Sequence, residues 1–145
     1  MVPLKEFMMN PDEFLKNETT KKLLWEAVAC NCVGDTKEAG NATELAMIKF
    51  VDRCGVDYKA IRAKYLPAKE NQDQLKRFPF DSARKRMSTI MDIPQEEVSS
   101  TEHGYGRRLH VKGASEIILG TCVNYLDESG NKVLLEDGMV QQLKK

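Results

Sequence analysis

Long apolar runs, an excess of charge of either sign and a secretion signal are all missing from this sequence. No stretch of 18 or more apolar residues occurs, so no segment is expected to cross a bilayer by itself. The first residues lack the apolar region of a signal peptide. The 22 lysines and arginines balance 22 acidic residues, and a neutral chain lacks the basic excess that nucleic acid or a membrane surface attracts. We therefore expect neither of these partners for this segment.

Cysteine and histidine are too few and too scattered to predict a disulfide framework or a metal site. Cys30 and Cys32 are two residues apart, which would place them on different faces of a helix. A metal site needs closer spacing and more ligands than the four cysteines and two histidines provide. We expect the cysteines to be reduced thiols in a cytosolic setting, and we expect no metal site. The cysteines are Cys30, Cys32, Cys54 and Cys122, and the histidines are His103 and His110.

The 145 residues, 41% of them hydrophobic, fit a single domain over 1–145 that holds its own core. Helix signals dominate the first half. Asn10-Pro11 predicts a helix start, and apolar residues at helical spacing follow around Leu24. A helix is predicted from Ala42 to Cys54, and a short one capped by Asp57.

Strand signals dominate the second half. Residues 75–80, 86–93 and 107–112 are predicted as strands, the first two forming a hairpin about a turn at 81–84. Residues 94–106 are predicted as a polar loop, and Gly113 to Glu116 as the start of a helix that runs on to Cys122 and Val123. Two short strands about a turn at 127–131 and a last helix at Asp137 complete the prediction. The fold class is α+β, an antiparallel β-sheet flanked by helices.

Three short segments carry side chains suited to binding chemistry. Glu44 follows Gly40-Asn41-Ala42-Thr43, in the first turn of a helix, where a carboxylate interacts with the helix dipole or accepts a hydrogen bond from a base amine. Phe80 closes a strand beside Arg84-Lys85-Arg86; the ring is either core or a stacking platform, and the cations either solvated or phosphate-facing.

The third segment is Val111-Lys112-Gly113-Ala114-Ser115-Glu116, in which a glycine lets a ligand approach beside a lysine. Together the segments supply the parts of a nucleotide pocket, although composition does not show that they converge. No Gly-x-x-x-x-Gly-Lys-Ser/Thr or Gly-x-Gly-x-x-Gly loop is present, which disfavours a free-standing kinase.

In this order the three segments resemble the nucleotide-binding (N) domain of P-type cation-transport ATPases. Residues 40–46 resemble the Gly-x-x-Thr-Glu-x-Ala stretch of that family, and residues 80–87 its Phe-x-Ser-x-Arg-Lys-x-Met stretch. Residues 112–116 resemble its Lys-Gly-Ala-(Pro/Ser)-Glu stretch, with the serine typical of plasma-membrane-type calcium pumps. The resemblance covers roughly residues 22–126.

The resemblance implies that Phe80 stacks on adenine and that Glu44 faces the adenine amine. It places Lys85 and Lys112 in the pocket, and Arg84 in a structural role. Ser82 stands where some members carry arginine. The nucleotide-binding residues so implied are Thr43, Glu44, Phe80, Ser82, Lys85, Met87, Lys112, Gly113 and Ala114, with no catalytic residue among them.

The phosphorylated aspartate of the family motif Asp-Lys-Thr-Gly-Thr is not in the sequence. The resemblance therefore implies an excised, C-terminally incomplete piece of a larger pump at the cytoplasmic face of a membrane. Its partners would be ATP, as Mg-ATP, and the phosphorylation and actuator domains of the same polypeptide. Such a piece would present the γ-phosphate to an aspartate elsewhere, drive transport of a cation, Ca²⁺ by the resemblance, and be inactive alone. The alternative is a regulatory or protein-interaction domain that does not bind nucleotide.

Overall fold

The computed structural model describes residues 15–34, 41–66, 76–98 and 106–143. The predicted helix start at Asn10 lies outside these ranges. The elements in chain order are α3 (Glu18–Cys30), α4 (Ala42–Arg53), α5 (Tyr58–Tyr65), β1 (Lys76–Asp81), β2 (Arg86–Asp92), α6 (Gln95–Val98), β3 (Arg107–Gly113), α7 (Ser115–Leu119), β4 (Asn124–Leu126), β5 (Lys132–Leu134) and α8 (Asp137–Leu143). The α+β prediction is confirmed.

Side-chain caps fix where the three long helices begin. The Asn17 side chain accepts a hydrogen bond from the backbone N–H of Thr20 at the start of α3, and Asn41 does the same for Glu44 in α4. Asp57 accepts from two N–H groups at the start of α5, as its sequence context predicts. Each cap satisfies helix N–H groups that have no partner within the helix.

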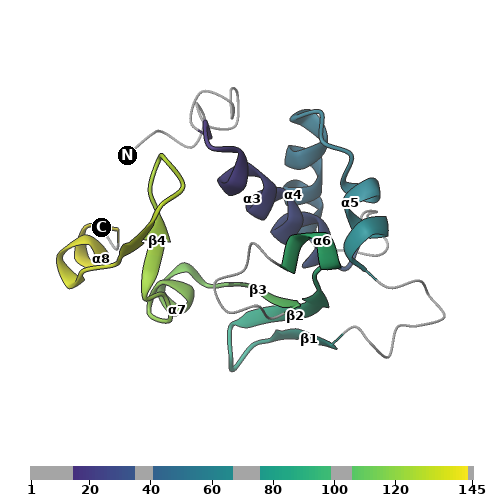
Figure 1. Cartoon of the computed structure of the whole chain (residues 1–145). Helices are drawn as coiled ribbons and strands as arrows, with labels where there is room; N and C mark the ends of the chain where they lie inside the picture. Colours follow the sequence, from purple (N-terminus) through teal and green to yellow (C-terminus); the bar gives the residue numbers. More distant parts are fainter. Residues whose placement is uncertain (1–14, 35–40, 67–75, 99–105, 144–145) are drawn as a thin grey trace.

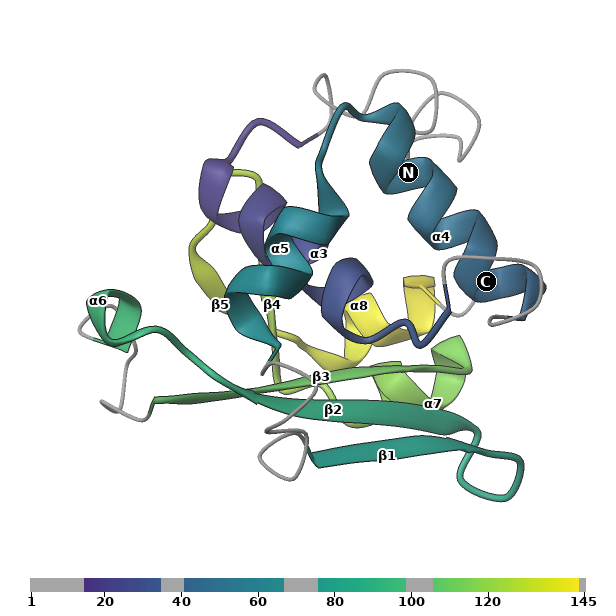
Figure 2. The same cartoon turned by 90° about the vertical axis from the view of Figure 1, so that its right-hand side faces the viewer.

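Three antiparallel strands form the sheet, in the order β1-β2-β3. Figures 1 and 2 show α3, α4 and α5 together over one face of this sheet. Along β2 the buried residues alternate, with Met87, Thr89 and Met91 facing the helices. The same period on β3 brings Arg108, His110 and Lys112 to that face, because they pair with Met91, Thr89 and Met87 respectively.

Two apolar clusters lie beneath and between the helices. One joins α3 to α4 through Val28, Ile48 and Val51, and the centroid of the Trp25 ring lies 5.8 Å from that of the Phe50 ring beside it. The other joins α3 and α5 to the sheet; its members are Ala29, Cys30, Tyr65 and Met91. Burial of these side chains supplies the main non-directional attraction between the layers.

Buried polar contacts complete the join between helices and sheet. Glu26 of α3 is 1% exposed and contacts both Arg108 Nη1 at 2.5 Å and His110 Nε2 at 2.7 Å. Burial alone would raise the pKa of Glu26, but the hydrogen bonds from His110 and Arg108 keep it below its ordinary value. Thr89 donates to Asn31 at 2.8 Å. In the described part of the chain, no buried side-chain polar atom lacks a partner.

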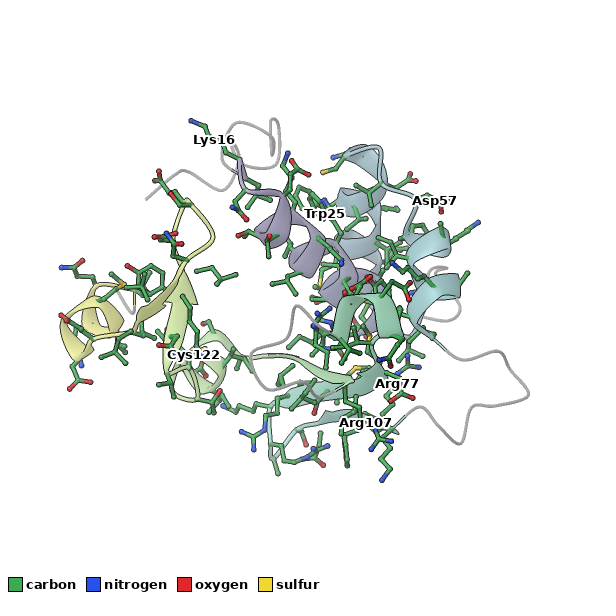
Figure 3. The ribbon with its side chains drawn as sticks, viewed as in Figure 1. Lys16, Trp25, Asp57, Arg77, Arg107 and Cys122 are labelled. Atoms are coloured by element: carbon green, nitrogen blue, oxygen red, sulfur yellow. The ribbon has the colours of Figure 1, made fainter. Side chains whose placement is uncertain are left out.

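The C-terminal segment differs from the prediction in the length of one helix. α7 ends at Leu119, so Cys122 and Val123 lie beyond it, because Gly120 and the turn that follows it interrupt the helical pattern. Figure 3 shows Cys122 on this side of the molecule, away from the three long helices. The hairpin of β4 and β5 returns to α3, where Asn17 Nδ2 donates to the Ser129 carbonyl at 2.7 Å.

The predicted polar loop 94–106 begins with a helical turn, which corrects that prediction. α6 carries Glu97, whose carboxylate bridges Lys22 Nζ at 2.7 Å and Lys64 Nζ at 2.6 Å and accepts from Tyr65 Oη at 2.8 Å. Burial raises the pKa of Glu97, but the hydrogen bonds from these three groups outweigh it and lower the value to about 2. One carboxylate therefore ties α6 to both α3 and α5.

Replacing Glu97 by Gln is expected to destabilise the fold in a pH-dependent way. The folded pKa of about 2 lies below the ordinary 4.5, so the stabilisation is complete above about pH 4.5 and is lost as the pH falls towards 2. At pH 6 we expect Glu97→Gln to lower the free energy of unfolding in urea by about 1–3 kcal/mol, the size of one or two charge-assisted hydrogen bonds. At pH 3 the difference in unfolding free energy between the wild-type chain and Glu97→Gln should be smaller.

The matched control is Glu96→Gln, because Glu96 is the exposed neighbour on the same helical turn. We expect it to change the unfolding free energy by less than about 0.5 kcal/mol at either pH. A Glu97→Gln effect of equal size at pH 3 and pH 6 would contradict the assignment of the lowered pKa to this carboxylate.

Candidate nucleotide-binding site

Glu44 is held at the N-terminus of α4 with its carboxylate directed inward. Asn41 caps the helix by accepting from the Glu44 N–H at 2.9 Å, which fixes the first turn. The Glu44 side chain is 6% exposed, whereas Thr43, one residue earlier, is exposed. A carboxylate at this place interacts favourably with the helix dipole. Because burial of an unpaired charge is costly, the carboxylate also needs a partner within hydrogen-bond distance.

Lys112 of β3 is that partner. Its Nζ lies 2.6 Å from Glu44 Oε1 and 3.3 Å from Cys32 Sγ, with the lysine side chain 23% exposed. The pair joins residues 68 positions apart in the sequence. Two of the three predicted segments therefore meet in space, as the pocket hypothesis requires.

The third segment reaches the same neighbourhood through the sheet. Met87 is directly opposite Lys112 in the pairing of β2 with β3 and is 2% exposed, so its side chain lies on the helix-facing side. Phe80 of β1 is 61% exposed and so is not a core residue. Its ring is available for stacking on a flat ligand.

A register shift in β1 decides the direction of Phe80. Phe78 pairs with Ser88 and Asp81 with Arg86, so β1 has one more residue than β2 between these two pairs. Extra residues of this kind change the direction of side chains beside binding sites. Counted back from Asp81, Phe80 falls on the side of Met87, whereas Phe78 falls on the outer side with Ser88.

The turn after β1 is built by Asp81. Its side chain accepts from the backbone N–H of Ala83 at 3.0 Å and of Arg84 at 2.8 Å. Arg84 Nη2 donates to the Pro79 carbonyl at 2.9 Å, a contact within the hairpin that fits its expected structural role. Ser82 is exposed at the tip. Lys85 closes the turn at φ 50°, a left-handed conformation that is costly for a residue with a Cβ atom.

Gly113 and Ala114 meet this turn at the end of β3. The Lys85 carbonyl accepts from the Ala114 N–H at 3.0 Å. A Cβ added at Gly113 would overlap the Lys85 carbonyl oxygen and lie 2.8 Å from Arg86 Cβ. The glycine therefore permits the backbone of the β1–β2 turn to approach β3. The sequence alone suggests a different reason for the same glycine, the close approach of a ligand.

The structure thus joins Glu44, Lys112 and Met87 on one side of the sheet and ties Lys85, Gly113 and Ala114 together through the backbone. It places Thr43 and Ser82 at the surface, outside these contacts. Sequence reasoning missed Cys32, which contacts Lys112 and is 1% exposed. It lies just beyond the end of α3, so the prediction that Cys30 and Cys32 occupy different faces of a helix is wrong. No sequence signal near Cys32 points to Lys112.

Two hollows in the described part of the chain lie away from these residues. One of about 540 Å³ lies between α4 and α5, lined by Leu45, Asp52 and Tyr58 among others. Another of about 400 Å³ lies between α3 and α5, beside Trp25 and Lys64. Neither includes Glu44, Phe80 or Lys112, so neither forms part of the predicted site.

Comparison with known proteins decides the family. The family model for the cytoplasmic domain N of P-type ATPases matches residues 14–145. The chain belongs to the P-type ATPase N-domain family. It is 39% identical over 98 residues to the calcium-transporting ATPase PAT1 of Dictyostelium discoideum, which covers 68% of this chain and 7% of that protein.

Two further relatives are plasma-membrane-type calcium-transporting ATPases. The protein mca-1 of Caenorhabditis elegans is 36% identical over 124 residues, covering 77% of this chain and 9% of its own length. Calcium-transporting ATPase 10 of Oryza sativa is 31% identical over 134 residues, covering 87% of this chain and 12% of its own length. The chain thus spans about a tenth of the relatives it matches.

In the described part of this N domain no helix is long and apolar enough to cross a membrane. Nor do the described residues contain a group of three or more histidine, cysteine, aspartate or glutamate side chains placed to hold a metal ion. All four cysteines are free thiols. Burial raises the pKa of Cys30 to about 12 and also raises that of Cys32, where Lys112 opposes the shift.

Replacing Gly113 by Ala is expected to destabilise the N domain by about 1–3 kcal/mol, because the new methyl group meets backbone atoms that cannot move aside. The control is Gly138→Ala in α8, where an added Cβ meets nothing within 4 Å and stability should be unchanged or slightly raised. Urea unfolding of both variants measures the difference. Equal stabilities would show that the β1–β2 turn does not pack against β3 in this way.

Proposed function

We propose that the chain is the ATP-binding domain of a P-type calcium pump. The observation that carries this proposal is the contact between Glu44 and Lys112, which brings two separate family motifs to one place beside Met87. Membership of the N-domain family and the calcium-transporting relatives support it. The remaining steps concern how these side chains would hold the nucleotide.

The base would lie between Phe80 and Glu44. Lys112 occupies Oε1 of the Glu44 carboxylate, and the described residues provide no donor for Oε2. Every buried side-chain oxygen in the described part has a hydrogen-bond partner. Because Oε2 has no such partner there, it is not fully buried and reaches solvent. It can accept from the exocyclic amine of adenine, while the exposed Phe80 ring would stack on the purine, a contact worth about 1–3 kcal/mol per base.

Lys85 and Lys112 would supply positive charge for the triphosphate, as Mg-ATP in the whole pump. The Lys112 ammonium group has three donors, and the described residues occupy two of them. Lys85 is exposed at the hairpin. Thr43 and Ser82 are proposed as outer wall residues, and Gly113 and Ala114 as backbone wall beside Lys112. Charge-assisted hydrogen bonds from lysine to phosphate suit this arrangement.

The domain would hold ATP and not cleave it. It would present the γ-phosphate to an aspartate on a separate phosphorylation domain, with the actuator domain as a further partner, on the cytoplasmic side of a membrane. Its contribution to the rate would be the high effective concentration of the held nucleotide, and Ca²⁺ would be the transported ion. The chain alone, which has no Asp-Lys-Thr-Gly-Thr sequence, should release no phosphate from ATP.

The test is a titration of the ¹⁵N-labelled 145-residue chain with ATP, followed by NMR. We expect saturable shifts at Glu44, Phe80 and Lys112. Phe80→Ala should weaken binding about 5- to 150-fold, the equivalent of one lost stacking contact. Phe78→Ala is the control, because Phe78 lies two residues away on the outer side of the sheet and its removal should leave the affinity unchanged.

A second ligand tests the role of Glu44. Guanine carries a carbonyl oxygen where adenine carries its amine, and an acceptor facing a carboxylate is repelled. We therefore expect GTP to bind more weakly than ATP. Absence of saturable shifts with ATP would favour the alternative, a regulatory or interaction domain, and an unchanged affinity in Phe80→Ala would exclude the stacking role.

A further inference from the structure

The ammonium group of Lys112 lies between two acceptors, one in α4 and one in the segment that follows α3. Glu44 Oε1, in α4, is 2.6 Å away, and Cys32 Sγ, just after α3, is 3.3 Å away. Lysine has a flexible four-carbon side chain, so a single partner restrains its direction only in part. Two acceptors at separate positions define where the third N–H of the ammonium group points.

Cys32 is itself firmly placed. It is 1% exposed and packs in the cluster with Val28, Ile48 and Val51. Its backbone carbonyl accepts from Arg62 Nη2 at 3.0 Å, and the same guanidinium donates through Nε to the Ala29 carbonyl at 2.8 Å. The sulfur therefore keeps its position relative to both α3 and α4.

A thiol suits this place because it accepts a hydrogen bond without carrying charge. Burial raises the pKa of Cys32, although Lys112 opposes the shift, so the sulfur stays protonated at neutral pH. Among the described residues, Glu44 is then the single carboxylate within ion-pair distance of Lys112. A second carboxylate at position 32 would compete for the ammonium group with the phosphate of a ligand.

We infer that Cys32 is a positioning residue, which acts through Lys112 to direct the free N–H of its ammonium group into the nucleotide site. The inference deepens the proposed function and rests on it for the identity of the ligand. From its burial alone, Cys32 would be regarded as a packing residue. The inference gives this thiol a part in ligand binding as well.

The first test compares ATP affinity in three variants of the 145-residue chain. We expect Cys32→Ala to weaken binding about two- to tenfold, the effect of one lost hydrogen bond to sulfur, which is a weak acceptor. Cys32→Ser, which keeps an acceptor, should recover most of the affinity. Cys30→Ala is the matched control: Cys30 is equally buried, two residues away, and belongs to the other cluster, so its removal should leave the affinity unchanged.

A double-mutant cycle separates positioning from packing. If Cys32 acts through Lys112, Cys32→Ala should have no further effect on ATP affinity in a Lys112→Gln background. An equal loss in both backgrounds, or the same loss in Cys30→Ala, would overturn the inference. Thermal unfolding of each variant establishes that the compared chains are folded.

The free chain distinguishes failure of this inference from failure of the proposed function. Without nucleotide, Cys32→Ala should shift the Lys112 Cε–Hε resonances, and Cys30→Ala should not. If the wild-type chain binds no ATP but these resonances shift, the nucleotide function fails and the contact between Cys32 and Lys112 stands. If they do not shift, Cys32 does not position Lys112, whatever the ATP titration shows.

Discussion

The alternation of β3 sets the position of nearly every charged contact between the sheet and the helices. Arg108, His110 and Lys112 occupy every second position and face the same side. The first two meet Glu26 of α3, and Lys112 meets Glu44 of α4. A slip of one residue would turn all three outward and leave two buried carboxylates without partners, a severe cost in a low-dielectric interior. This polar row therefore specifies the register as well as the contact between layers.

Gly113 sits at the end of that row and connects it to the hairpin. Because it has no side chain, the turn carrying Lys85 can pack against the end of β3. The same turn holds Lys85 at φ 50°, where glycine would be the less costly residue by about 1 kcal/mol or more. Strain of this kind persists where the surrounding structure enforces it and often accompanies function. A cation kept at a position that favours glycine supports the proposal that Lys85 meets phosphate.

The sequence predicted the elements where local chemistry determines them. The helix that starts at Ala42, the cap at Asp57, and the hairpin about the turn at 81–84 follow from short-range rules. Errors occurred where few residues form an element: the turn of α6 within the predicted loop, and the early end of α7. Neither Glu97 in α6 nor Gly120 after α7 is distinctive without its neighbours in space.

The candidate site shows the same division. Motif resemblance predicted Glu44, Phe80 and Lys112, but not that the first and last form an ion pair. Cys32 was missed altogether, because its contact spans 80 positions in the sequence and no local pattern marks it. Gly113 was predicted for a reason that differs from the one in the structure: its space is filled by Lys85 and Arg86. Long-range pairing supplies what composition and spacing do not contain.

An ion pair within a binding site also limits how tightly the site can hold its ligand. One N–H of Lys112 already donates to one carboxylate oxygen of Glu44. A nucleotide would therefore gain hydrogen bonds only from the donors and acceptors of the pair that remain open. Breaking the pair to gain more would leave a buried charge uncompensated, at a cost that exceeds one new hydrogen bond. The proposed nucleotide would therefore bind beside the pair, not in place of either member. The geometry therefore predicts modest affinity for the proposed nucleotide, which would suit a domain that is proposed to hand a phosphoryl group to another domain and then release the product.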